Sequence, residues 1–81
     1  MNTDGTWSTK DSKLNKRFEF EDFAGALDFV NRVGELAEKE EHHPDISFGW
    51  GYVEISLFTH SEDAITDKDR KLADAINQIQ G

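Results

Sequence analysis

The feature that most constrains the fold is a change in the spacing of apolar residues along the chain. Between residues 22 and 41 the spacing is three or four positions, and the residues are Phe23, Ala26, Leu27, Val30, Val33 and Ala37. Such spacing places apolar side chains on one face of a helix. Asp22 is a suitable cap for its first turn, and Pro44 forces the helix to stop before it. We therefore expect a helix over residues 22–41.

Two other segments alternate with a period of two, which is typical of half-buried strands. Residues 13–20 place Leu14, Phe18 and Phe20 on one side, although Lys16 interrupts the pattern. Residues 45–60 read as a hairpin with glycines near its bend, and its second strand, 52–59, has an apolar side made of Val53, Ile55 and Leu57. Phe58 lies on the other, mostly polar side, which suggests a second buried surface or a subunit contact.

The two ends of the chain complete the pattern. Residues 1–12 are polar, and we expect a short edge strand around Trp7 before a single domain over residues 13–81. Near the other end, Thr66 and Asp69 have the spacing of a capping box, followed by an apolar face made of Leu72, Ala73, Ile76 and Ile79. The order β-β-α-β-β-α predicts an α+β fold in which both helices pack on one face of an antiparallel sheet.

Composition excludes several classes of function. The 81 residues include 17 acidic and 9 basic ones, for a formal charge of −8, so direct nucleic-acid binding and attachment to an anionic membrane are disfavoured. Zero cysteines exclude disulfides, thiolate metal sites and a cysteine nucleophile. No apolar run is long enough to span a membrane and no targeting signal is visible, so we expect a cytoplasmic protein.

The three histidines are the strongest candidates for chemistry. His42 and His43 precede Pro44 where the first helix ends, and His60 follows the last predicted strand. Imidazole can give and take a proton near neutral pH. Adjacent residues in extended backbone point to opposite sides, so His42 and His43 are poor joint ligands for one metal. The alternatives are a helix end with solvated imidazoles and, for His60, an ordinary surface loop.

Asp69 and Glu38 are the carboxylates with a candidate role beside these histidines. Asp69 can be the far end of the capping box, or it can orient an imidazole and fix its tautomer, and the two roles are compatible. Glu38 belongs to an acidic run that is more commonly a solvated helix face. From the residues alone, the reading ends at a small acidic α+β domain with a candidate histidine acid–base site.

Four runs in the chain carry a more specific resemblance. They are Arg17-Phe18-x-Phe20-x-x-Phe23-x-x-Ala26-x-x-Phe29-Val30, Ala37-Glu38-x-x-x-His42-His43-Pro44-Asp45, Val53-x-Ile55-x-Leu57-x-Thr59-His60 and Thr66-x-x-Asp69-x-x-Leu72-Ala73. In order and spacing they resemble the pterin-4a-carbinolamine dehydratases over roughly residues 13–80. The resemblance implies a four-stranded antiparallel sheet with helices on one face, assembled as homodimers or homotetramers.

The resemblance also implies an activity. Family members are hydro-lyases that need no metal or organic cofactor, and they eliminate water from 4a-hydroxy-tetrahydropterin to give quinonoid dihydropterin during tetrahydrobiopterin recycling. The family's catalytic histidines fall on His42, His43 and His60. Its substrate-binding positions fall on Glu38, His43, Pro44 and Asp69. We expect His42 and His60 to share proton transfer and His43 to hold the pterin.

One departure keeps other functions open. Family members usually have a helix before the Gly-x-Trp segment, whereas here Gly5-Thr6-Trp7 is almost the start. The alternatives are a non-catalytic pterin-binding or protein-dimerisation module, since animal members also serve as dimerisation cofactors of a homeodomain transcription factor, and a relative acting in molybdopterin-cofactor metabolism. Retention of three histidines and Asp69 favours the enzyme.

Overall fold

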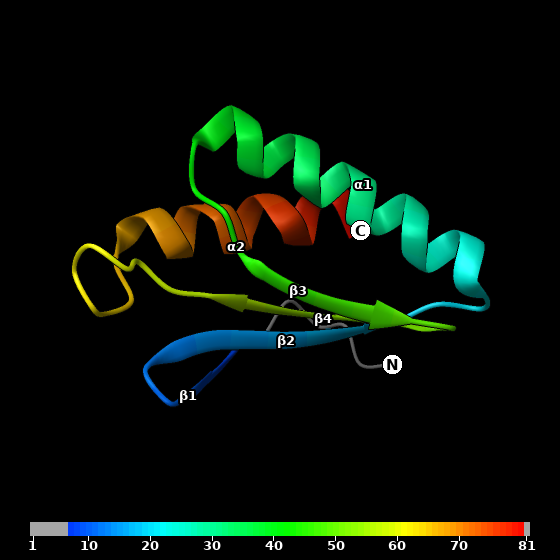
Figure 1. Ribbon diagram of the computed structural model, residues 1–81, viewed down its shortest axis with the longest axis horizontal. Coiled ribbons are helices and arrows are strands. Elements are labelled where there is room, and N and C mark those ends of the chain that lie inside the picture. Colours follow the sequence, from blue (N-terminus) through cyan, green and yellow to red (C-terminus); the bar gives the residue numbers. More distant parts are fainter. Residues whose placement is uncertain (1–6, 81) are drawn as a thin grey trace.

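Both helices lie on one side of a four-stranded sheet, as the sequence predicts (Figure 1). The computed structural model describes residues 7–80. The strands are β1 (Ser8–Lys10), β2 (Lys13–Glu19), β3 (Asp45–Gly49) and β4 (Tyr52–Leu57), and the helices are α1 (Phe23–Glu40) and α2 (Asp67–Gln80). Residues 1–6 of the predicted polar segment 1–12, and Gly81, lie outside the described residues.

The strands are all antiparallel and follow the order β1-β2-β4-β3. The register places Leu14 of β2 opposite Leu57 of β4, and Ile46 of β3 opposite Ile55 of β4. The predicted apolar side of β4 is confirmed, because Val53, Ile55 and Leu57 are all buried beneath the helices. The predicted edge strand near Trp7 begins one residue later, at Ser8.

Only Trp50 and Gly51 separate β3 from β4, so the hairpin turn is tight. Gly51 has a φ of +82°, a conformation in which a side chain is strained. Its carbonyl oxygen accepts a hydrogen bond of 2.8 Å from the backbone N–H of Phe20. This contact ties the turn to the end of β2 and to the start of the segment that leads into α1.

Helix α1 begins as predicted, because the Asp22 side chain accepts a 2.8 Å hydrogen bond from the N–H of Gly25. Its buried residues, however, are Ala26, Phe29, Val33 and Ala37. The predicted apolar face is therefore partly wrong: Phe23 and Leu27 are 44% and 38% exposed. Successive helical residues are about 100° apart, so Leu27 cannot share the direction of Ala26. The Phe23 ring instead stacks on Phe48 of β3.

The end of α1 is set by Glu41, which adopts the left-handed conformation with a φ of 55°. The N–H groups of Glu41 and His42 return to the carbonyl oxygens of Glu38 and Ala37, at 3.3 and 3.1 Å. This arrangement closes a helix in the manner of a Schellman cap. The helix thus ends before Pro44, as predicted, but through a left-handed residue three positions earlier.

Lys16 interrupts the apolar alternation of β2 without leaving the buried face. Its side chain packs between the sheet and α2, where its Nζ lies 2.9 Å from Oδ1 of Asn77 and 4.9 Å from the centroid of the Phe18 ring. Leu72, Ala73 and Ile76 of α2 fill the rest of this side of the core.

Neither helix in the described part of the chain is long and apolar enough to cross a membrane.

Candidate functional site

A buried carboxylate and a half-buried imidazole meet where α1 ends and α2 begins. Nε2 of His42 lies 2.5 Å from Oδ1 of Asp69. The Asp69 side chain is fully buried, while 13% of the His42 side chain is exposed. His42 comes from the segment after α1 and Asp69 from the first turn of α2, so the contact joins the two helices at one end of the sandwich.

The other carboxylate oxygen of Asp69 accepts two further hydrogen bonds. Thr59 donates its hydroxyl to Oδ2 at 2.7 Å, and the backbone N–H of Thr66 donates to Oδ2 at 2.9 Å. The bond from Thr66 is half of the predicted capping box. Burial by itself would raise the pKa of the Asp69 carboxyl, but the hydrogen bonds from His42, Thr59 and Thr66 outweigh it and lower that pKa below its ordinary value.

The ionised carboxylate fixes the tautomer of the neutral His42 ring. An ionised carboxylate only accepts hydrogen bonds, so Nε2 of His42 carries the hydrogen that points at Asp69. Nδ1 of the neutral ring then holds a free lone pair. An imidazole oriented in this way can accept a proton at Nδ1 and return it, which is what a general base requires.

His43 points to a different neighbour from His42, as expected for adjacent residues in extended backbone. Its Nε2 lies 2.7 Å from Oε2 of Glu38 on α1. This pair is open to solvent, since 62% of the His43 side chain and 78% of the Glu38 side chain are exposed. Because the pair is exposed, both groups are accessible to a ligand. A pair so exposed also contributes little to the free energy of unfolding.

Glu38, His43 and Pro44 also line a cavity of about 520 Å³ between α1 and the start of β3. The remaining walls are made of apolar and polar groups together: Val30, Asn31, Gly34, Glu35, Ala37 and Ile46. A flat heterocycle with polar edges fits such a lining. His42 and His60 are not among the residues that line it.

His60 lies in the loop after β4, where it is exposed and packs edge-on against the Phe58 ring, with centroids 5.1 Å apart. Among the described residues it makes no hydrogen bond or ring contact with the other two histidines. It is nevertheless adjacent in sequence to Thr59, whose hydroxyl binds Asp69. Phe58, predicted to face a second buried surface, is half-buried, and the Lys13 ammonium lies 5.7 Å from its ring centroid.

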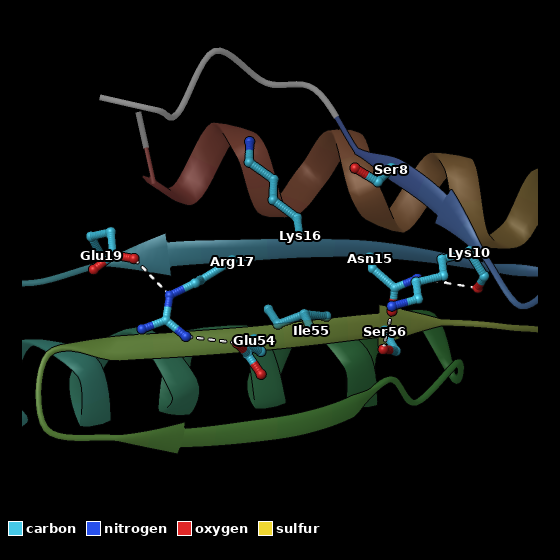
Figure 2. Close-up of a pocket in the computed structure, with 9 residues that line it drawn as sticks. All are labelled: Ser8, Lys10, Asn15, Lys16, Arg17, Glu19, Glu54, Ile55 and Ser56. Carbon is cyan, nitrogen blue, oxygen red and sulfur yellow. Dashed lines mark hydrogen bonds and ion pairs between the residues drawn. The ribbon is translucent and has the colours of Figure 1, made fainter.

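A larger cavity, of about 590 Å³, lies over the face of the sheet that no helix covers (Figure 2). Figure 2 shows Arg17 between Glu19 and Glu54, both at 2.7 Å, with Asn15 and Ser56 further along the same strands. None of the predicted site residues lines this cavity. Its walls carry ion-paired polar side chains, so the contact between His42 and Asp69 is the better candidate for chemistry.

Two polar residues around Asp69, Thr59 and Thr66, were not predicted as site residues from the sequence. Thr59 is buried, and its Oγ1 lies 2.7 Å from Oγ1 of Thr66 as well as from Asp69. The available signal was that Thr59 interrupts an apolar strand end directly before a histidine, ten positions ahead of Asp69. Among the described residues, no three histidine or carboxylate side chains converge in the manner of a metal site.

Comparison with known proteins gives a consistent assignment. The family model described as "Pterin 4 alpha carbinolamine dehydratase" matches residues 1–79. A protein of Rubrobacter xylanophilus is 50% identical over 74 residues, and one of Methylococcus capsulatus is 43% identical over 75. Both bear the name "Putative pterin-4-alpha-carbinolamine dehydratase". Each alignment covers 90% of this chain, and the chain spans 69% and 66% of the two relatives.

Solved structures share the fold. The crystal structure titled "transcriptional coactivator/pterin dehydratase from Brucella Melitensis" has a TM-score of 0.89 at 36% identity, over 96% of this chain and 84% of that one. A pterin dehydratase-like protein identified as a RuBisCO assembly factor in the alpha-carboxysome has a TM-score of 0.76 at 28% identity, over 94% and 88%. The fold, the order of the motifs and the family model agree, and the chain therefore belongs to the pterin 4 alpha carbinolamine dehydratase family.

Proposed function

We propose that the protein is a 4a-hydroxytetrahydropterin dehydratase. The substrate would be 4a-hydroxytetrahydrobiopterin or a close analogue, and the product quinonoid dihydropterin, as in tetrahydrobiopterin recycling. The observation that carries the proposal is the contact between His42 and the buried Asp69, which leaves Nδ1 of the neutral imidazole as a proton acceptor. The family membership supplies the substrate class.

The elimination needs two proton transfers. One group removes the proton from the ring nitrogen, the electron pair forms the new double bond to C4a, and the C4a–oxygen bond breaks as a second group protonates the leaving hydroxyl. The products are water and the quinonoid ring, and no electrons are gained or lost. We assign the base to His42 and the acid to His60, and the step uses no resident cofactor.

Ring binding is assigned to the cavity lined by Glu38, His43 and Pro44, because the apolar groups in its walls suit a flat heterocycle and the imidazole–carboxylate pair suits its polar edge. Since His42 and His60 do not line that cavity, the reacting edge of the ring has to project past Pro44 toward them. Nuclear magnetic resonance (NMR) titration with a non-reactive reduced pterin tests this placement. Shifts confined to the uncovered face of the sheet would contradict it.

The test of activity is the dehydration of 4a-hydroxytetrahydropterin generated by a coupled hydroxylase. The key variant is His42→Gln, whose amide can still donate to Asp69 but cannot act as a base at neutral pH. Wild-type protein should accelerate dehydration, and the folded variant should lose about 100-fold or more in kcat. Ser56→Ala, which removes a hydroxyl from the uncovered face of the sheet, is the matched control. A folded wild type without acceleration would refute the proposal.

A protein-binding function is the second candidate, and an exposed aromatic group favours it. Trp50 is 73% exposed in the β3–β4 turn, and Phe23, 44% exposed, stacks on Phe48 at the same end of the molecule. One structural relative is named as an assembly factor. Analytical ultracentrifugation of wild type and Trp50→Ser measures whether this surface mediates self-association. Loss of a homodimer or homotetramer in the variant, with dehydration retained, would assign this surface to assembly.

A further inference from the structure

Thr59 is connected to both histidines of the proposed mechanism: to His42 through Asp69, and to His60 as its neighbour in the sequence. Its side chain is almost completely buried, with 4% of the residue exposed, at the point where β4 gives way to the loop that carries His60. Its hydroxyl binds the carboxylate that holds His42. A buried hydroxyl makes hydrogen bonds or costs free energy, so these contacts constrain the residue strongly.

The hydrogen bonds around Thr59 have a defined direction. Thr59 has one hydroxyl hydrogen, and it points at Oδ2 of Asp69. The 2.7 Å contact between the hydroxyls of Thr66 and Thr59 must then be donated by Thr66. The chain therefore runs from Thr66 to Thr59 to Asp69, and His42 donates to Asp69 from the opposite side. Thr59 and His42 thus donate to the ionised carboxylate directly, and the Thr66 hydroxyl supports it through Thr59.

The same residue fixes the loop on which His60 lies. The backbone N–H of Thr59 donates to the carbonyl of Ala64 at 3.1 Å, and the N–H of Ala64 returns to Thr59 at 3.4 Å. The N–H of Glu62 also donates to the Thr59 carbonyl, at 3.1 Å. The loop over residues 60–63 is thus closed at its base by Thr59. Displacement of this residue would move His60 and disturb Asp69 together.

We infer that Thr59 is a positioning residue of the dehydratase site, which holds Asp69 so that His42 keeps its hydrogen on Nε2 and presents Nδ1 to the substrate. The inference rests on the proposed function for its catalytic part only. Thr59 occupies Oδ2 and leaves Oδ1 to His42. Without the hydroxyl, only the backbone N–H of Thr66 still donates to Oδ2, so the carboxylate is held by one hydrogen bond fewer and can shift against His42. Misplacing a catalytic base by about 1 Å can reduce a rate by about 100-fold.

The experiment compares Thr59→Val, which keeps the branched shape and removes the hydroxyl, with Thr59→Ser, which keeps the hydroxyl. The first readout is the ¹⁵N NMR spectrum of the imidazoles, which distinguishes protonated from unprotonated ring nitrogens. With three histidines in the chain, His43→Gln and His60→Gln variants assign the signals of His42. The second readout is the separation of kcat from KM in the coupled dehydration assay.

In wild type and Thr59→Ser, neutral His42 should show a protonated Nε2 and an unprotonated Nδ1. In Thr59→Val both signals should move toward averaged positions, and kcat should fall about tenfold or more while KM changes little. Ser56→Ala, which removes a hydroxyl from β4 on the uncovered face of the sheet, should match wild type in both readouts. If Thr59→Val does not fold, Thr59→Cys has nearly the same volume with a weaker donor, and the same changes are expected.

Two results would overturn the inference. One is a folded Thr59→Val, or Thr59→Cys, whose His42 signals and kcat equal those of wild type. The other is a Thr59→Ser variant as impaired as Thr59→Val, which would assign the effect to the lost methyl group. A wild type with the expected His42 signals but no dehydration would refute the proposed function alone, because the spectra still test the positioning of His42 by Thr59.

Discussion

Nε2 of His42 lies 2.5 Å from Oδ1 of Asp69, and the carboxylate is completely buried. Asp69 also accepts from Thr59 and from the backbone of Thr66. A buried carboxylate with several donors can remain ionised because each hydrogen bond stabilises its charge. The contact therefore stabilises the fold and, under the proposed mechanism, also prepares His42 for proton transfer.

Replacing Asp69 by asparagine should reverse the tautomer of His42. The asparagine oxygen has to face Thr59 and Thr66, which both donate, so its amide group turns toward His42. His42 must then accept at Nε2 and carry its hydrogen on Nδ1. We expect a loss of about 2 kcal/mol in the free energy of unfolding and a fall in kcat of about 100-fold or more. Urea denaturation and ¹⁵N NMR provide the measurements; an unchanged His42 spectrum in the variant would contradict the assigned tautomer.

The free energy of unfolding should depend on pH through the carboxylate of Asp69. Folding lowers the pKa of Asp69, so its ionised form stabilises the protein at pH values above the unfolded pKa of about 3.9. That contribution is lost as the pH falls through the lower, folded value. The difference in unfolding free energy between wild type and Asp69→Asn should therefore be largest above about pH 5 and should shrink as the pH drops below 4. A difference that stays constant down to pH 3 would exclude this linkage.

The exposed pair of His43 and Glu38 should behave differently. Because 62% and 78% of these side chains are exposed, Glu38→Gln should change the free energy of unfolding by less than about 0.5 kcal/mol. Under the proposed ring-binding role, KM for the pterin should rise severalfold while kcat stays near the wild-type value. The comparison with Asp69→Asn is direct, since both variants remove one carboxylate beside one histidine. A large loss of stability in Glu38→Gln would show that the pair is structural.

Two glycines offer a matched test of backbone conformation. Gly34 lies within α1, and a Cβ there would have no neighbour within 4 Å, so Gly34→Ala should stabilise the protein by about 0.5–1 kcal/mol. Gly51 has a φ of +82°, and a Cβ would lie 3.2 Å from the carbonyl oxygen of Phe20. Gly51→Ala should therefore cost about 1–2 kcal/mol. Thermal denaturation should show opposite shifts, and shifts of the same sign would contradict the hairpin geometry.

Much of the fold could be predicted because its signals are local. The period of two over 13–20 and 52–59 and the helical spacing after Asp22 each report an element on their own. The exact orientation of α1 could not be predicted, because Phe23 and Phe29 are equally apolar and only the position of the sheet makes Phe29 the buried one. Lys16 is the second case, since its burial depends on Asn77, which lies 61 positions away.

The site shows the same division. The motif order proposes the site residues, and the contact between His42 and Asp69 is the imidazole–carboxylate pairing that the sequence offers as one role of Asp69. The hydroxyl of Thr59 could not be placed in advance, because its contacts with Asp69 and Thr66 form only when the end of β4 meets the start of α2. The roles of the three histidines in catalysis stay predictions until the variants are measured.

The left-handed conformation of Glu41 has a consequence for how the histidine dipeptide can change over evolution. It turns the chain out of α1 so that His42 joins the interior while His43 remains on the surface. Two identical neighbours in the sequence are thereby under different physical constraints. Substitution of the inner histidine is limited by the buried carboxylate of Asp69, whereas the outer one is not limited in this way, so under the proposed roles the ring-binding position could change while the contact between His42 and Asp69 is kept.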